Sequence, residues 1–137
     1  MPFLLDTCVW IDVERGVLAP GDVAALTGED TVYLSPVTLA ELRLGAEIAV
    51  SEDLRQRRLA ALTRIQRQPV LPMDGVTGMV FGAVAAAVRQ AGRQHRSRIQ
   101  DLWLASQAIQ HHCRLLTRNP HDFEHIPALD IAVYRLA

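Results

Sequence analysis

Lysine is absent from the 137 residues, so all 14 residues in the Lys and Arg count are arginines. A chain without lysine cannot form a lysine Schiff base and cannot carry the lysine of a Walker-type phosphate loop. Cysteine is scarce as well. Cys8 and Cys113 lie far apart and form no CxxC motif, so the pattern indicates neither a zinc site nor a disulfide framework. We expect both to be buried, reduced thiols.

The sequence also lacks a long apolar run. The longest candidate, Val76–Val88, is interrupted by glycine and threonine and is too short to span a bilayer. The N-terminus has no basic stretch followed by an apolar region of signal-peptide length. Half of the residues are apolar, however, and a chain of 137 residues is long enough to form one hydrophobic core. The sequence predicts one globular, cytoplasmic domain over residues 1–137.

The net charge of −1 hides a strong asymmetry along the chain. Residues 1–53 hold ten acidic side chains against two arginines, whereas residues 54–118 hold eleven arginines against two aspartates. An acidic half followed by a basic half favours a polyanionic partner that approaches an acid-lined site. A solvated, arginine-rich helical surface is the alternative explanation.

Short apolar segments alternate with segments of helical periodicity. Strands are predicted at residues 3–6, 32–35, 69–72, 114–117 and 131–134, and helices at 7–14, 20–26, from 36 onward, 52–67, 76–91 and 99–111, with a basic loop at 93–98. Ser35 and Pro36 mark a helix start, with an N-cap serine and a proline at the first helical position. This alternation is typical of an α/β domain with a largely parallel central sheet flanked by helices.

Acidic and amide side chains fall where the predicted strands end. Asp6 ends the first strand, Glu41 lies early in the helix after the second, and Asn119 and Asp122 follow the fourth. In an open parallel sheet, ligands bind outside the carboxyl ends of the strands, where the strand order reverses. These positions converge if the first strand is central.

Two of the acids also have a purely structural explanation. Asp6 could form a turn at the strand end or cap the helix that follows it. Asp101, which opens the helix before the fourth strand, could favour the helix dipole and cap free amides. Glu41 is more informative, because it lies near the apolar stripe of its helix and needs a partner or a metal. Converging carboxylates raise one another's pKa, and Mg²⁺ relieves the repulsion by taking oxygen ligands. The acids therefore favour metal-assisted phosphodiester hydrolysis, with arginines as phosphate contacts.

Four segments follow one another in a recognisable order. They are LLDTCVWID at 4–12, LAELRLGAE at 39–47, IQDLWLASQA at 99–108 and LLTRNPHDFEHIPAL at 115–129. Together they resemble the motifs of the PIN-domain family, and specifically the VapC toxins of bacterial toxin–antitoxin pairs. The metal-binding acids of the first three motifs match Asp6, Glu41 and Asp101. Many family members carry an acid where this chain has Asn119, and Asp122 could compensate for it.

The resemblance implies a parallel sheet with strand order 3-2-1-4-5, a homodimer, and a small VapB-like antitoxin that occupies the active-site groove. It also implies cleavage of RNA, often tRNA or ribosomal RNA, with Mg²⁺ or Mn²⁺ as the metal. Thr7, Thr117 and Asn119 are predicted to support the site. From the basic half of the chain, we expect Arg93, Arg96, Arg98 and Arg118 to contact RNA.

Three other functions compete with a toxin nuclease. A phosphotransfer enzyme of the haloacid-dehalogenase type would resemble this chain in its aspartate after the first strand. It usually has a DxD signature and a basic residue near the phosphate, whereas here Cys8 follows Asp6 by two positions and lysine is missing. A PIN nuclease that is not a toxin, or a PIN module that binds RNA without cutting it, would share the motifs. A nuclease assay with and without Mg²⁺ separates a catalytic from a non-catalytic module.

Overall fold

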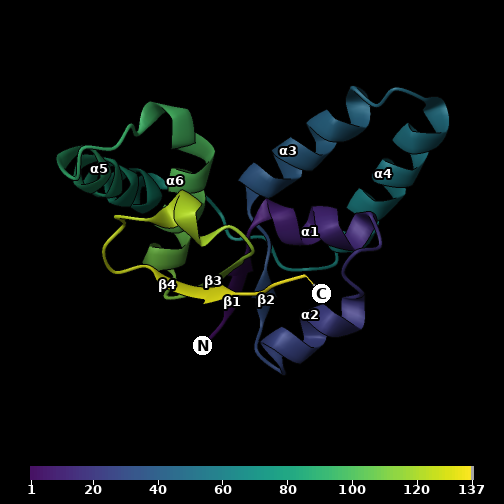
Figure 1. Ribbon diagram of the computed structural model, residues 1–137, viewed down its shortest axis with the longest axis horizontal. Helices are drawn as coiled ribbons and strands as arrows, with labels where there is room; N and C mark the ends of the chain where they lie inside the picture. Colours follow the sequence, from purple (N-terminus) through teal and green to yellow (C-terminus); the bar gives the residue numbers. More distant parts are fainter. Residues whose placement is uncertain (137) are drawn as a thin grey trace.

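A parallel β-sheet runs through the middle of the molecule, with helices on both of its faces (Figure 1). The computed structural model describes residues 1–136, apart from the side chain of Ser97. Within that range the strands are β1 (Phe3–Leu5), β2 (Val32–Tyr33), β3 (Arg114–Thr117) and β4 (Asp130–Val133). They are arranged in the order β2-β1-β3-β4, and every pairing is parallel. The prediction of a parallel α/β sheet is confirmed.

The segment at 69–72, predicted as a strand, is reduced to a single bridge. Val70 pairs in parallel with Leu34, beside β2 and away from β1. Leu34 donates to the carbonyl of Pro69, and Leu71 donates to that of Leu34, both at 2.9 Å. Pro69 and Pro72 have no N–H to offer, so the ladder cannot extend in either direction. The segment still takes the outer position that the predicted order 3-2-1-4-5 gives it.

Six α-helices lie within the described range, close to the predicted positions. They are α1 (Thr7–Glu14), α2 (Pro20–Thr27), α3 (Pro36–Glu47), α4 (Glu52–Ile65), α5 (Gly75–Gln90) and α6 (Ile99–Gln110), with short 3₁₀ turns η1 (Arg96–Arg98) and η2 (Pro120–Phe123). Part of the predicted basic loop is therefore η1. No helix of residues 1–136 is both long enough and apolar enough to cross a membrane.

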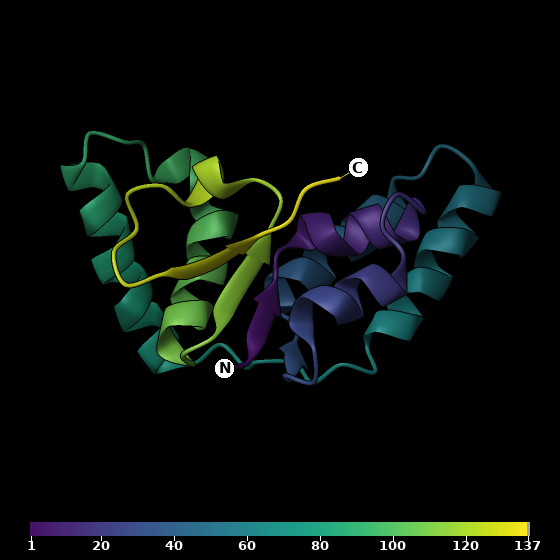
Figure 2. The ribbon, with the colours of Figure 1, turned by 60° about the horizontal axis from the view of Figure 1, so that its bottom comes forward.

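The side chains of the sheet alternate between two apolar cores. Leu4 and Leu115 face a core shared with α5 and α6, whereas Leu5 and Leu116 face a core shared with α1. This follows from the strand geometry, since successive side chains point to opposite faces. Figure 2 shows α5 and α6 on one side of the sheet and α1 and α2 on the other. Both faces are covered, which explains why the strands read as continuous apolar runs.

A buried polar contact joins the helices that carry two of the predicted site residues. The hydroxyl of Ser35, at the start of α3, donates to the side-chain carbonyl of Gln107 on α6. The Gln107 amide in turn donates to the backbone carbonyl of Leu71 at 2.9 Å. Neither side chain has exposed area. The contact therefore fixes α3, with Glu41, against α6, with Asp101.

Candidate active site

Asp6 lies at the carboxyl end of β1 and is 6 % exposed. It is the N-cap residue of α1, but its side chain makes no capping hydrogen bond. The Oδ2 atom instead accepts from the hydroxyl of Thr117 at 2.8 Å and from the thiol of Cys8 at 3.4 Å. Burial raises the pKa of the Asp6 carboxyl, and these two hydrogen bonds oppose the shift. The capping explanation is therefore not supported, and the carboxylate faces the end of the sheet.

Glu41 reaches the same region from α3. Its Oε1 accepts a hydrogen bond of 3.2 Å from the hydroxyl of Thr7, the residue after Asp6. The Thr7 hydroxyl also lies 3.0 Å from that of Thr38. Since Thr7 gives its proton to Glu41, Thr38 is the donor in that second bond. Burial raises the pKa of the Glu41 carboxyl, and the charge of Asp6 raises it further.

Asp101 completes the group from the first turn of α6. Burial, followed by the charges of Asp6, Asp122 and Glu41, raises the pKa of its carboxyl to about 7, whereas Arg98 lowers it. The contributions of Asp6 and Glu41 to this pKa mean that the three acids lie within electrostatic reach of one another. The structure therefore brings Asp6, Glu41 and Asp101 together, from three segments far apart in the sequence.

The donors of this group fit a hard divalent cation. All three are carboxylates, and their mutual repulsion is relieved by a positive charge between them. Across residues 1–136, no three His, Cys, Asp or Glu side chains are close enough to form a ready-made metal site. Mg²⁺ does not need one, because it binds through one or two carboxylates and keeps several waters. Asp6, Glu41 and Asp101 are therefore the residues that would hold the ion, directly or through water.

The predicted supporting residues differ in how they contact the acids. Thr7 and Thr117 each donate a hydroxyl hydrogen bond to an acid of the group, as described above. Within residues 1–136, no hydrogen bond is found between the side chain of Asn119 and any of the three acids. Its backbone N–H donates to the Thr117 hydroxyl at 3.0 Å, which orients that hydroxyl toward Asp6. Asn119 thus contributes through its main chain.

Asp122, the additional candidate ligand, lies in η2 at the edge of the group. Its charge contributes to the raised pKa of both Asp6 and Asp101. The carboxylate pairs with the guanidinium of Arg98 at 3.3 Å. Asp122 is therefore close to the acids but already neutralised by an arginine.

The four predicted RNA-binding arginines lie in different surroundings. Arg98 pairs with Asp122 and lies close enough to Asp101 to lower the pKa of its carboxyl, whereas Arg118 donates to Asp12 on α1 at 3.1 Å. Arg93 pairs with Glu124 at 3.1 Å on the surface. Arg96 is exposed, and no ion pair is found for it within residues 1–136. The prediction treated all four arginines alike. In the structure, Arg93, Arg98 and Arg118 each pair with an acid.

Several residues of this region were not predicted. Thr38 has no signal beyond its place in the first turn of α3, and Asp12 and Tyr134 form a buried hydrogen bond of 2.8 Å across 122 residues. Cys8, expected to be buried, is partly exposed and contacts Asp6. Burial and the charge of Asp6 raise the pKa of its thiol to about 11, so it remains protonated. Cys113 is buried, and both cysteines are free, as predicted.

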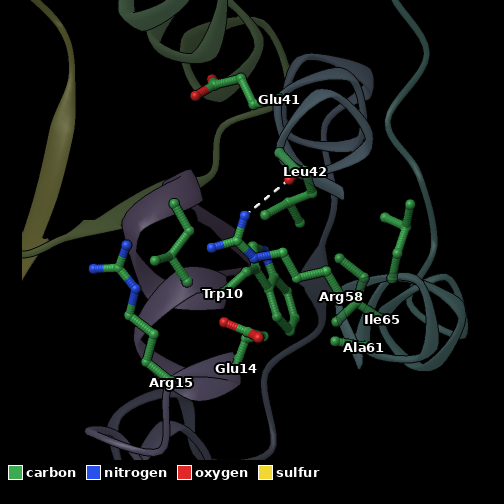
Figure 3. A pocket seen from close by; sticks show the side chains of 11 residues that line it. Trp10, Glu14, Arg15, Glu41, Leu42, Arg58, Ala61 and Ile65 are labelled. Atoms are coloured by element: carbon green, nitrogen blue, oxygen red, sulfur yellow. Dashed lines mark hydrogen bonds between the residues drawn. The ribbon is translucent and has the colours of Figure 1, made fainter. Parts of the chain in front are cut away.

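A pocket of about 220 Å³ opens beside Glu41, between α1, α3 and α4 (Figure 3). Trp10, Leu42 and Ile65 give it apolar walls. Arg58 spans it and donates to the backbone carbonyl of Gly45 at 2.8 Å. The carboxylate of Glu41 points away from the Arg58 guanidinium (Figure 3), and its Oε1 accepts the hydrogen bond from Thr7. Glu41 therefore belongs both to the acidic group and to the lining of this pocket.

The fold and the acidic group together define a known class of protein. The pattern of the PIN domain matches residues 3–129. The chain therefore belongs to the PIN-domain family, as its four motifs predicted.

Individual relatives make the similarity more specific. The chain is 34 % identical to ribonuclease VapC5 of Mycobacterium tuberculosis over 116 residues, which cover 85 % of this chain and 82 % of that protein. It is similar to the solved structure of VapBC-5 from the same organism, at 28 % identity and a TM-score of 0.78, with 97 % and 98 % of the two chains covered. DNA-bound VapBC from Salmonella typhimurium gives 25 % identity and a TM-score of 0.83, over 97 % and 98 %. The predicted resemblance to the VapC type is confirmed.

Proposed function

We propose that this chain is a Mg²⁺-dependent endoribonuclease that acts as the toxin of a VapBC-type toxin–antitoxin pair. The observation that carries the proposal is the convergence of Asp6, Glu41 and Asp101 at the end of the sheet, supported by the curated ribonucleases to which the chain is similar. Structured RNA, such as tRNA or ribosomal RNA, is the proposed substrate. A cytoplasmic location follows from that substrate, and Mn²⁺ can replace Mg²⁺ because it prefers the same oxygen ligands.

The residues of the chain supply the geometry for hydrolysis. When bound, Mg²⁺ would activate water and stabilise negative charge on a phosphoryl oxygen. Thr117 and Cys8 hold one oxygen of Asp6, and Thr7 holds one oxygen of Glu41. These hydrogen bonds fix the orientation of both carboxylates. Hydroxyl groups that hold metal-binding carboxylates in this way tune both affinity and activity.

An antitoxin is the proposed regulatory partner, because the solved structures to which the chain is similar are toxin–antitoxin complexes. An acidic cleft that binds a cation also attracts an arginine, whose planar guanidinium pairs with carboxylates. We expect the antitoxin to place an arginine against Asp6, Glu41 and Asp101 and so to exclude the ion. A homodimer is part of the same proposal.

A nuclease assay tests the enzymatic part directly. The purified chain is incubated with bulk bacterial tRNA and ribosomal RNA, with Mg²⁺ or with EDTA. We expect cleavage with Mg²⁺, none with EDTA, and none from Asp101→Asn. If Asp101→Asn cleaves at the rate of the wild type, the assigned site is wrong.

Expression in a bacterial host tests the toxin part. The chain alone should arrest growth, co-expression with its antitoxin should restore growth, and Asp6→Asn should abolish the arrest. Asp130→Asn, which changes an acid at the surface of β4, is the matched control and should remain toxic. Harmless expression of the soluble wild type would exclude the toxin role but would leave a PIN nuclease with another task.

A further inference from the structure

Asp12 is a buried carboxylate that the acidic group does not use. It lies on α1 and is 2 % exposed. Tyr134 donates its hydroxyl to Oδ2 at 2.8 Å, and Arg118 donates from Nη1 to Oδ1 at 3.1 Å. Both oxygens therefore have partners, which compensates the cost of burying the charge.

The pair between Asp12 and Arg118 is asymmetric. The carboxylate side chain is 3 % exposed, whereas the side chain of Arg118 is 37 % exposed. A guanidinium has five N–H donors in one plane, and within residues 1–136 the hydrogen bond to Asp12 uses a donor on Nη1. One end of the group is thus fixed inside the protein, and the remaining donors are left for a ligand on the solvent side.

Arg118 is also tied to the acids through its neighbours. It follows Thr117, whose hydroxyl donates to Asp6. Asp12 lies six residues beyond Asp6, or about 9 Å along the helix at 1.5 Å per residue. The guanidinium is therefore anchored at a point on α1 that is displaced from Asp6 along the helix.

We propose that Asp12 and Tyr134 are positioning residues that hold the Arg118 guanidinium ready to bind an RNA phosphate next to the scissile one. The inference rests on the proposed function and specifies how the site holds its substrate. An arginine that is fixed before binding loses less conformational entropy when the phosphate arrives. Tyr134 contributes because its hydroxyl fixes the second oxygen of Asp12 and so the orientation of the whole carboxylate.

The direction in which Asp12→Asn changes the affinity for RNA distinguishes a positioning role from a purely electrostatic one. Asp12→Asn removes a negative charge near the substrate, so electrostatics alone predicts equal or tighter RNA binding. Positioning predicts weaker binding, because Arg118 loses its charged anchor. Tyr134→Phe changes no charge and should weaken binding in the same direction.

The measurement is the affinity for labelled bulk bacterial tRNA over a series of salt concentrations, in the Asp101→Asn background so that the RNA stays intact. We expect Arg118→Ala to weaken binding about tenfold and to reduce the salt slope by about 1. Asp12→Asn should weaken it about threefold, and the variant with both changes should bind no more weakly than Arg118→Ala alone, because the two residues act as a unit.

Asp130→Asn is the matched control, because Asp130 pairs with Arg114 at 3.3 Å on the surface, at the other end of β3. It should bind tRNA as tightly as the parent or slightly more tightly. Thermal unfolding checks that each variant is folded. If Asp12→Asn does not fold, the affinity of Tyr134→Phe for tRNA decides whether Arg118 is positioned in this way.

Unchanged or tighter binding by Asp12→Asn and Tyr134→Phe would overturn the inference, as would additive losses in the variant with both changes. The nuclease assay of the wild type is independent of this series. Absence of cleavage there would refute the proposed function, whereas the binding series decides the role of Asp12 in either case.

Discussion

Thr117 donates a hydrogen bond of 2.8 Å to the Asp6 carboxylate, although 111 residues separate the two in the sequence. The threonine ends β3, the aspartate follows β1, and the parallel register of these strands places Leu5 beside Leu116 just before them. The contact is therefore a direct product of the sheet topology. It also fixes the orientation of the Asp6 carboxylate.

Thr117→Val should weaken the metal site without unfolding the protein. The valine has nearly the volume of threonine but removes the hydroxyl that orients Asp6. Loss of an outer partner of this kind typically costs about 10–100-fold in metal affinity or activity. The Mg²⁺ concentration that gives half-maximal RNA cleavage should rise accordingly. Thr63→Val, on the exposed face of α4, is the control and should leave that concentration unchanged.

Asp101→Asn should abolish cleavage and stabilise the metal-free protein. The Asp101 carboxyl has its pKa raised to about 7 in the folded state, above the ordinary value of 3.8, so folding favours its protonated form. Its contribution to stability is therefore favourable at low pH and is lost as the pH rises through about 7. Above that pH, asparagine removes the repulsion, and we expect a gain of about 1 kcal/mol, or about 3–5 °C in Tm. Asp130→Asn should give no such gain, and a lower Tm for Asp101→Asn would contradict this account.

Mg²⁺ binding should be linked to pH through the same carboxyl. Because the metal binds the ionised form, Asp101 must release its proton when the pH lies below its pKa of about 7. The increase in Tm caused by Mg²⁺ should therefore be large at about pH 8 and much smaller at about pH 6. Differential scanning fluorimetry of the wild type measures this. An equal increase at both pH values would show that Asp101 does not bind the ion.

Alanine at Arg93, Arg96 and Arg98 together should weaken RNA binding and reduce its salt dependence. Each lost phosphate contact lowers the slope of log affinity against log salt by about 1. Because Arg93 and Arg98 already have acidic partners, we expect a total reduction of about 1–2 rather than the full 3. The matched control replaces Arg43, Arg55 and Arg114, which form surface ion pairs elsewhere and carry the same total charge. If both triple variants bind alike, the basic segment is only a solvated surface.

Local signals predicted most of the helices and strands. Ser35 and Pro36 start α3 as expected, and the Ser35 hydroxyl accepts the capping hydrogen bond from Val37. The segment at 69–72 was predicted as a short strand, and its two prolines limit it to a single bridge between Val70 and Leu34. Asp101 was assigned to the site because the four motifs follow one another in the order of the family. Its local pattern was not sufficient, since an acid at a helix start is common for structural reasons.

Partners that lie far apart in sequence were beyond prediction. Asp12 carries no local signal of its role, because its partners Arg118 and Tyr134 come from the last fifth of the chain. Which arginine pairs with which acid depends on side-chain packing between segments, and neither charge counts nor periodicity contain that information. The pairing of Arg98 with Asp122 was missed for the same reason.

The distance in sequence between Asp6 and Thr117 determines when the site can form during synthesis of the chain. Chains are synthesised at about 5–20 residues per second, so Thr117 is added roughly 6–22 s after Asp6. Until then the first strand has no neighbour at β3, and Asp6 lacks its hydroxyl donor. The nuclease proposed here therefore cannot become active early in its own translation.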